Sequence, residues 1–119
     1  MNLWKGTAVI KKDPVLQKMG DRTVYNFTAC NTEVIRDPSG AIIDRNEFWL
    51  DCRWVNPLWE QISRLKALSL VYLEGACHVR WFTRTDGSQD HVTQLEVSYA
   101  VWQKQVGDTQ STRSDNSSE

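Results

Sequence analysis

The sequence has few of the features that mark a membrane, secreted or metal-binding protein. No apolar run approaches the roughly 20 residues that span a bilayer, and residues 1–5 lack the apolar core of a signal peptide. The three cysteines, Cys30, Cys52 and Cys77, lie far apart without a Cys-x-x-Cys pair, which argues against a disulfide framework and a zinc site. We therefore expect a cytoplasmic protein with reduced cysteines, no metal and no membrane partner.

An excess of charge is missing too. The chain has 14 basic and 15 acidic residues, a formal net charge of −1, so a nucleic acid would have to be bound by a local patch and by stacking. Residues 107–119 contain no apolar side chain and hold three of the acids. We predict one folded domain over residues 1–106, followed by a disordered polar tail over residues 107–119.

Signatures of catalysis are also missing. The two histidines, His78 and His91, stand beside no nucleophile motif, and the chain has neither a phosphate-binding loop nor a His-Glu-x-x-His motif. Asp86 and Asp90 flank an Asp-Gly turn, and turn chemistry already accounts for them. We expect a binding protein that uses no cofactor, and not an enzyme.

Tryptophan is the residue that the chain has in excess. It has six tryptophans, three tyrosines and three phenylalanines, and one core of this size rarely needs so many large rings. Some rings should therefore be exposed, and exposed rings indicate a partner. Trp4 and Trp59 are expected in the core or at a subunit interface, and Trp102 is expected to pack at the end of the last strand.

The pattern of apolar residues and turn signals predicts an all-β domain with one short helix. Alternating and β-branched segments indicate strands over residues 4–12, 23–32, 47–55, 70–73 (closed by Glu74-Gly75), 77–84 and 91–101. Turns are predicted at Asp13-Pro14, residues 19–21, residues 36–40 and Asp86-Gly87. Asn56 as N-cap and Pro57 at the first helical position indicate a helix that ends near Leu68 and buries Leu58, Ile62 and Leu65. This order predicts a five-stranded OB-fold barrel with long hairpin loops.

Several segments occur in the order found in one known family. They are Trp4–Pro14 as an opening strand with its Asp-Pro, Val24–Ala29 as a second strand, Val71–Gly75 close to a Val-Tyr-Ile-Glu-Gly motif, and the Asp86-Gly87 hairpin that closes with Leu95–Val97. Together they resemble the bacterial single-stranded DNA-binding protein family over roughly residues 2–102. The resemblance implies an OB-fold that assembles into dimers or tetramers and wraps single-stranded DNA by aromatic stacking.

The chain also departs from that family. Val34 stands where the family has a stacking tryptophan, and Leu68 replaces the usual glycine before the fourth strand. The tail lacks the acidic tip with a terminal Pro-Phe that recruits partner enzymes. These departures indicate a divergent member, of the kind that a plasmid, phage or integrating element carries.

Candidate binding residues lie on two predicted strands. On residues 77–84, alternation puts cations around one ring on a single face: His78, Arg80, Phe82 and Arg84. Rings that stack on bases and cations that follow phosphates are what single-strand binding needs. Phe82 also matches a family stacking position. Lys11, Lys12 and Arg36 are further candidates for phosphate contacts.

The strand over residues 47–55 leaves two interpretations open. Simple alignment with the family puts Phe48 and Trp54 at stacking positions. Polarity favours the opposite face, with Trp49 and Arg53 toward the DNA, because Asp51 and Arg53 belong in water. A one-residue offset or a bulge would reconcile the two.

Three functions remain compatible with these observations. The first is a general binder of single-stranded DNA in replication, repair, recombination or DNA transfer. The second is an adaptor like the primosomal replication proteins, which share this fold and mainly bridge protein partners. The third is an RNA-binding OB module, because nothing in the sequence reads a 2′-hydroxyl. The aromatic content favours the first, acting as a homo-oligomer, with replication proteins as further partners.

Overall fold

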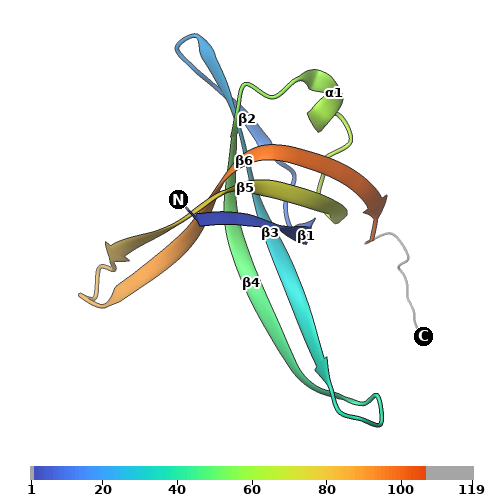
Figure 1. Cartoon of the computed structure of the whole chain (residues 1–119). Coiled ribbons are helices and arrows are strands. Elements are labelled where there is room, and N and C mark those ends of the chain that lie inside the picture. The colour runs from blue at the N-terminus through green and yellow to red at the C-terminus, as the bar shows by residue number, and fades with distance from the viewer. Residues whose placement is uncertain (1, 107–119) are drawn as a thin grey trace.

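The computed structural model of the chain describes residues 2–106, which form one sheet and one short helix (Figure 1). The elements in chain order are β1 (Asn2–Ile10), β2 (Val15–Met19), β3 (Arg22–Arg36), β4 (Ile42–Val55), α1 (Trp59–Ile62), β5 (Ser69–Thr83) and β6 (Gln89–Gln105). The predicted tail over residues 107–119 lies outside the described residues. Within residues 2–106, no helix has both the length and the apolar character needed to cross a membrane.

Five of the six strands close into a ring. The strand order is β1-β5-β6-β4-β3-β2, and β1 also pairs with β3, so that β2 remains as an extra strand on β3. Neighbouring strands are antiparallel except β4 and β6, which run parallel through the short stretch from Asp51↔Gln94 to Arg53↔Glu96. This arrangement confirms the prediction of a mostly-β, five-stranded OB-fold barrel with one short helix.

The barrel interior follows the two-residue period of the strands. In the five strands of the ring, alternate residues point inward and are buried, among them Ala8, Ile10, Phe27, Ala29, Leu50, Cys52, Val71, Leu73, Leu95 and Val97. Ile62 of α1 and Leu65 of the loop after it join this core. The Tyr25 hydroxyl donates a hydrogen bond to the Leu65 carbonyl at 3.2 Å, which fastens that loop to β3.

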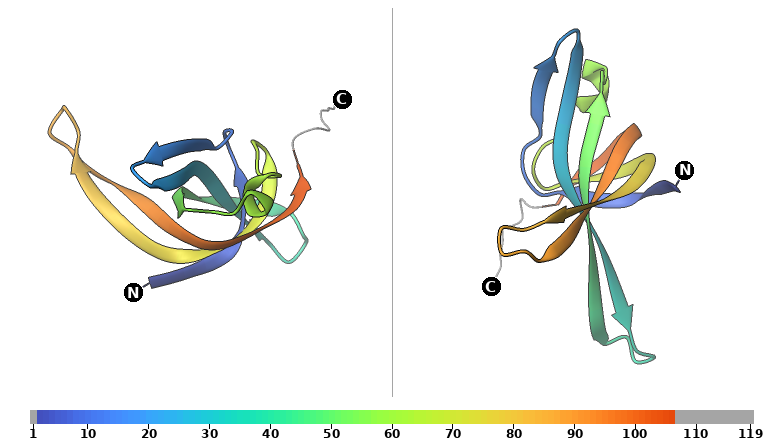
Figure 2. Two further views of the ribbon diagram at one scale, coloured as in Figure 1. Left: turned by 90° about the horizontal axis from the view of Figure 1, so that it is seen from above. Right: turned by 90° about the vertical axis from the view of Figure 1, so that its left-hand side faces the viewer.

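Two long hairpins extend beyond the barrel in different directions (Figures 1 and 2). We call residues 31–49 the β3–β4 arm and residues 78–93 the β5–β6 arm. Their strands stay paired out to Arg36↔Ile42 and Thr83↔Gln89. The predicted turn at Asp86-Gly87 is confirmed, because Gly87 has a φ of 89° and its N–H donates to the Arg84 carbonyl.

The predicted end of a strand at Glu74-Gly75 is wrong, because β5 runs through it without a break. The register shifts there, from Glu74↔Tyr99 to Gly75↔Val97, which makes a β-bulge on β6. A Cβ at Gly75 would lie 2.3 Å from the backbone oxygen of Glu96. The glycine therefore allows a close approach of β6 and does not mark a turn.

The predicted helix start at Asn56 and Pro57 is also wrong. Asn56 has a φ of 51°, and its side-chain oxygen accepts a hydrogen bond from the N–H of Thr23 at 2.9 Å. It thus ends the β3–β4 pairing, while Leu58 takes the N-cap position with an exposed side chain. The helix is a single turn, although Ile62 and Leu65 are buried as predicted.

Strand β2 and the full length of the arms were not predicted. Residues 15–19 have no alternation of buried and exposed positions, since every residue of β2 is exposed. The β3–β4 arm has both faces exposed over most of its length, so its sequence also lacks a two-residue pattern of burial. Hydrophobic alternation detects a strand only where one of its faces is buried.

Leu68 occupies a backbone conformation that suits glycine. Its φ of 66° lies in the left-handed region. The Leu68 N–H donates a hydrogen bond to the Ile10 carbonyl at 2.6 Å, and the Leu68 carbonyl accepts one from the Val106 N–H at 2.8 Å. The two bonds hold the backbone in place, so the strain of a leucine cannot be relieved by local rearrangement. This explains physically why glycine is usual there in the family that the sequence resembles.

Leu68→Gly should therefore raise the free energy of unfolding by about 0.5–1 kcal/mol. Relief of the left-handed strain, about 1–2 kcal/mol, exceeds the entropic cost of a glycine, about 0.5–1 kcal/mol. Urea unfolding measures the difference. Ala67→Gly is the matched control and should lower stability, because Ala67 does not have a positive φ; a loss of stability in both variants would contradict the assignment of strain to Leu68.

Candidate nucleic-acid interface

Strand β4 resolves the choice between its two faces. Leu50, Cys52 and Trp54 point into the barrel, and Trp54 is only 5% exposed. Trp49 lies on the opposite face and is 48% exposed. A base cannot stack on a ring in the core, so the structure removes Trp54 as a candidate and keeps Trp49.

Phe48 shares the inward-pointing side of β4 but lies beyond the closed part of the barrel. It is 38% exposed, and its ring lies 6.2 Å from the ring of Trp4, centroid to centroid. Trp4 in turn packs against the core as expected. Phe48 is thus part of a ring pair at the mouth of the barrel, on the face opposite to Trp49.

Strand register brings the two predicted groups of binding residues to one side of the sheet. Asp51 of β4 is paired with Gln94 of β6, and Gln94 is paired with His78 of β5. Paired residues project to the same side of a sheet, and every second residue follows them. We call this side the outer face; its candidate residues are Trp49, Arg53, His78, Arg80, Phe82 and Arg84.

Both candidate rings of the outer face, Trp49 and Phe82, have a cation beside them. The Lys11 ammonium lies 5.8 Å from the centroid of the Trp49 ring, and the Arg84 guanidinium lies 5.7 Å from that of Phe82. Cations at this distance are attracted to the ring face. The same pairing of a stacking surface with a phosphate-binding charge is how single strands are held.

Acidic residues neutralise part of this face. Arg53 lies 3.9 Å from the Glu96 carboxylate, and Arg84 forms an ion pair with Asp90. Within residues 2–106, Lys11 and Arg80 are in no ion pair. Their charges are therefore the most available for phosphates.

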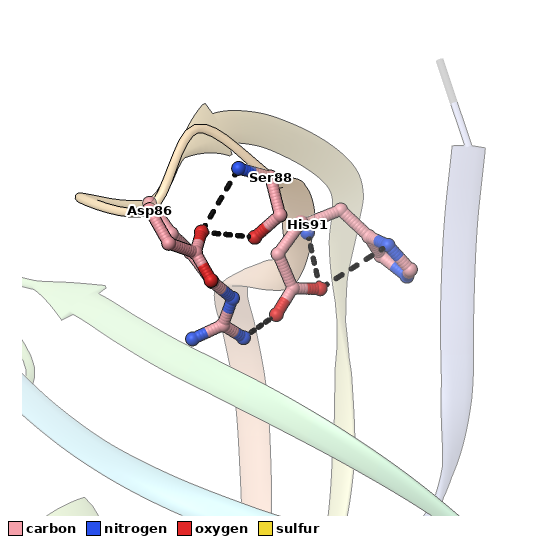
Figure 3. Close-up of polar contacts among 5 residues, drawn as sticks. Asp86, Ser88 and His91 are labelled. Carbon is pink, nitrogen blue, oxygen red and sulfur yellow. Dashed lines mark hydrogen bonds and ion pairs between the residues drawn. The ribbon is translucent and has the colours of Figure 1, made fainter.

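The tip of the β5–β6 arm is held by a short polar network (Figure 3). Asp86 accepts hydrogen bonds from the Ser88 N–H at 2.9 Å and the Ser88 hydroxyl at 2.6 Å, which lower the pKa of its carboxyl group. Asp90 connects Arg84 with His91, whose Nδ1 lies 3.9 Å from it. Turn chemistry therefore accounts for Asp86, as predicted, whereas Asp90 lies on β6 and is engaged by Arg84 and His91.

The remaining predicted cations are less well placed. Lys12 is exposed in the loop after β1. Arg36 lies at the end of the β3–β4 arm and donates a hydrogen bond to the Gly40 carbonyl at 2.8 Å, so it already has a role in the loop. Val34, on the same arm, is 38% exposed and offers no ring.

Sequence reasoning missed two exposed tryptophans. Trp81, on the face of β5 opposite to Phe82, is 64% exposed, and its ring centroid lies 4.8 Å from that of His91. Trp59 is 72% exposed, so it does not lie in the core, and its alternative place at a subunit interface stays a prediction. Trp102 does pack against the core, as expected, with the Arg64 guanidinium 5.1 Å above its ring. Alternation along residues 77–84 was the signal that separated Trp81 from Phe82, but it did not show that both faces are exposed.

The cysteines lie where reduced cysteines are expected. Cys30 and Cys52 are buried, Cys77 is half-buried, and all three are free thiols. Burial, with smaller contributions from Asp51 and Cys77, raises the pKa of the Cys52 thiol well above its ordinary value. The thiol therefore stays protonated and acts as a core side chain.

The barrel with its two arms is an OB-fold that has counterparts among solved structures. The chain is similar to the structure described as Plasmodium falciparum SSB complex with ssDNA, with a TM-score of 0.68 and 17% identity over 87% of this chain and 96% of that one. It is also similar to the small single-stranded DNA-binding protein from Streptomyces coelicolor, with a TM-score of 0.73 and 16% identity over the same shares. No protein-family model matches the sequence, and no curated protein sequence does either. The predicted resemblance is thus confirmed at the level of the fold, in a divergent sequence.

The assignment of faces on β4 predicts that two tryptophan substitutions destabilise the protein to very different extents. Trp54→Ala should lower the free energy of unfolding by about 3–5 kcal/mol, because it leaves a large cavity in the core. Trp49→Ala should lower it by about 1 kcal/mol or less, since that ring is half in solvent. Thermal unfolding followed by circular dichroism compares them; equal losses would show that the two faces are assigned wrongly.

Proposed function

We propose that the protein binds single-stranded DNA through the outer face, without strong sequence preference and without catalysis. Bases stack on Trp49 and Phe82, while Lys11, Arg80 and Arg84 contact the phosphates. The observation that carries this proposal is the placement of two exposed rings, each with a cation near it, on the side of their strands that the pairing through β6 makes common to both. The similar Plasmodium protein was solved in complex with single-stranded DNA, which supports the same use of this fold.

Stacking also supports the choice of single strands and the lack of sequence preference. A ring can stack only on a base that is free of its own neighbours, so duplex DNA offers the outer face little beyond its phosphates. Every base has a π face, so stacking alone does not discriminate among bases. We infer a role in replication, repair, recombination or DNA transfer, in the cytoplasm.

The proposal includes self-association into a dimer or tetramer. Residues 2–8 of β1 pair with β5 on one side, whereas the pairing with β3 is limited to Val9 and Ile10. Among the described residues, the other edge of this segment pairs with no strand, although the Thr7 carbonyl accepts a hydrogen bond from the Asn31 side chain; unpaired edges invite pairing. Leu3, at 77% exposed, and Tyr99, at 47% exposed, are apolar residues on the same outer side of this part of the sheet.

One observation favours an adaptor as the second candidate function. The β3–β4 arm exposes Val34, Ile35, Ile42 and Ile43, with Ile43 at 64% exposed. An apolar patch on a protruding hairpin fits a protein partner better than a nucleic acid. An adaptor of the primosomal type, bridging replication proteins, would use this arm in place of the outer face.

Titration with oligo-dT tests the proposed function. Stacked bases should quench the intrinsic tryptophan fluorescence, and the logarithm of the affinity should fall with the logarithm of salt concentration at about −0.7 per neutralised phosphate. Parallel titrations use oligo-U and duplex DNA. Absence of any salt-sensitive complex with oligo-dT would reject the proposal, and tighter binding to oligo-U would identify RNA as the ligand.

Substitutions on the outer face should separate stacking from charge. Phe82→Ala should weaken binding of oligo-dT by about 1–3 kcal/mol with the salt slope unchanged, because it removes a stacking ring. Arg80→Ala should flatten the slope by about 0.7, because one phosphate contact is lost. Trp59→Ala, which removes an exposed ring outside the face, is the control. If it weakens binding as much as Phe82→Ala does, the outer face is not the binding surface.

A further inference from the structure

A cleft lies where the two arms separate from the barrel. Parallel pairing of β4 with β6 reaches back only to Asp51 and Gln94, so the preceding residues of the two strands diverge. The space between them has a volume of about 260 Å³. It is lined by Glu47, Phe48, Trp49, His91, Val92 and Thr93.

The cleft leads from the outer face to the opposite side of the sheet. Consecutive residues of a strand project to opposite sides. Because both Phe48 and Trp49 line the cleft, and both His91 and Val92, it spans the thickness of the sheet. Its outer opening therefore lies beside Trp49, one of the two rings proposed to stack on bases.

The walls suit a flat ring. Phe48 is 38% exposed and is supported from behind by Trp4. His91 has the ring of Trp81 as its neighbour, 4.8 Å away between centroids. Each wall thus carries an aromatic side chain that packs with a second aromatic ring, and such packing restricts its motion before any ligand arrives.

Charge and size limit what can enter. Glu47 lines the cleft and no lysine or arginine does, so an acidic residue disfavours a phosphate group there. Pockets for drug-sized ligands are roughly 300–1,000 Å³, and this cleft is slightly smaller. Its size and its walls therefore fit a single heterocyclic ring.

We propose that this cleft takes one nucleobase of the strand that the outer face binds. The base leaves the stack beside Trp49, enters between the arms and lies between Phe48 and His91, while its phosphates stay outside on the cationic face. This inference rests on the proposed function. It adds a base subsite that contributes affinity but no phosphate contact.

Filling the cleft tests the inference. Thr93→Phe places a ring in it and should weaken binding of oligo-dT by about 5- to 150-fold, the worth of one stacked base. The salt slope should stay unchanged, because no phosphate contact is lost. The same variant should bind an abasic oligonucleotide of equal length as well as the wild type does, since that strand has no base to insert. Thr83→Phe, on the same face of the arm but outside the cleft, is the matched control and should leave binding of oligo-dT unchanged.

The outcomes separate this inference from the proposed function. A wild-type protein that fails to bind oligo-dT rejects both. A wild type that binds, with Thr93→Phe either equal to it or equally impaired on both oligonucleotides, rejects the base subsite alone. Thermal unfolding checks that the Thr93→Phe variant is folded. If it is not, His91→Ala serves instead, because it removes one wall of the cleft. A loss of affinity for oligo-dT alone would then support the subsite, and unchanged binding of oligo-dT would reject it.

Discussion

The short parallel pairing of β4 with β6 is the constraint on which the rest of the structure depends. Only Asp51 to Arg53 and Gln94 to Glu96 take part, yet they close the sheet into a barrel. Closure buries Leu50, Cys52 and Leu95 on the inner side. Burial of apolar surface in such a core is the dominant favourable contribution to the free energy of folding. Since the pairing stops after so few residues, both strands leave the barrel in different directions, each with its antiparallel partner (Figure 2). The arms, the cleft between them and the exposure of Trp49 all follow from this early end of the pairing.

The same pairing determines which side chains act together. β4 and the β5–β6 hairpin are separated by the helix in the sequence, so nothing local relates Trp49 to Phe82. Register through β6 places both on one side of the sheet, and the pairing of β5 with β6 toward the arm begins at the bulge beside Gly75, where the two backbones approach closely. A side chain at Gly75 would collide with the backbone of β6 and would push β5 and β6 apart at the base of the arm that carries Phe82. The glycine is thus structural, although it lies far from any proposed contact with DNA.

Sequence reasoning predicted those elements whose physical cause is local. Asp86-Gly87 specifies its turn through backbone conformation, and buried alternation identified the strands at the barrel. The errors arose where long-range contacts decide the outcome: Asn56 looks like a helix cap but is bonded across the sheet to Thr23, and Glu74-Gly75 looks like a turn but is a close crossing. For the candidate site, the outer face of β5 was predicted as one unit, and its connection to Trp49 was not, because register between distant strands cannot be seen in one sequence. The exposure of Trp81 was not predicted, because alternation assumes that one face of a strand is buried, and an arm has both faces in solvent.

The near-neutral charge of the chain has a consequence for how such a surface would work. With a formal net charge of −1, there is no long-range field to concentrate polyanions around the protein, and ion pairs occupy Arg53 and Arg84 of the outer face. The few free cations contribute a short-range attraction that salt screens within about 10 Å. Stacking is much less sensitive to salt, so the rings must supply the larger part of the affinity of one chain. The affinity of such a protein for single-stranded DNA would rise most if more rings contacted the same DNA strand. Self-association would supply these additional stacking contacts without changing the charge of each chain.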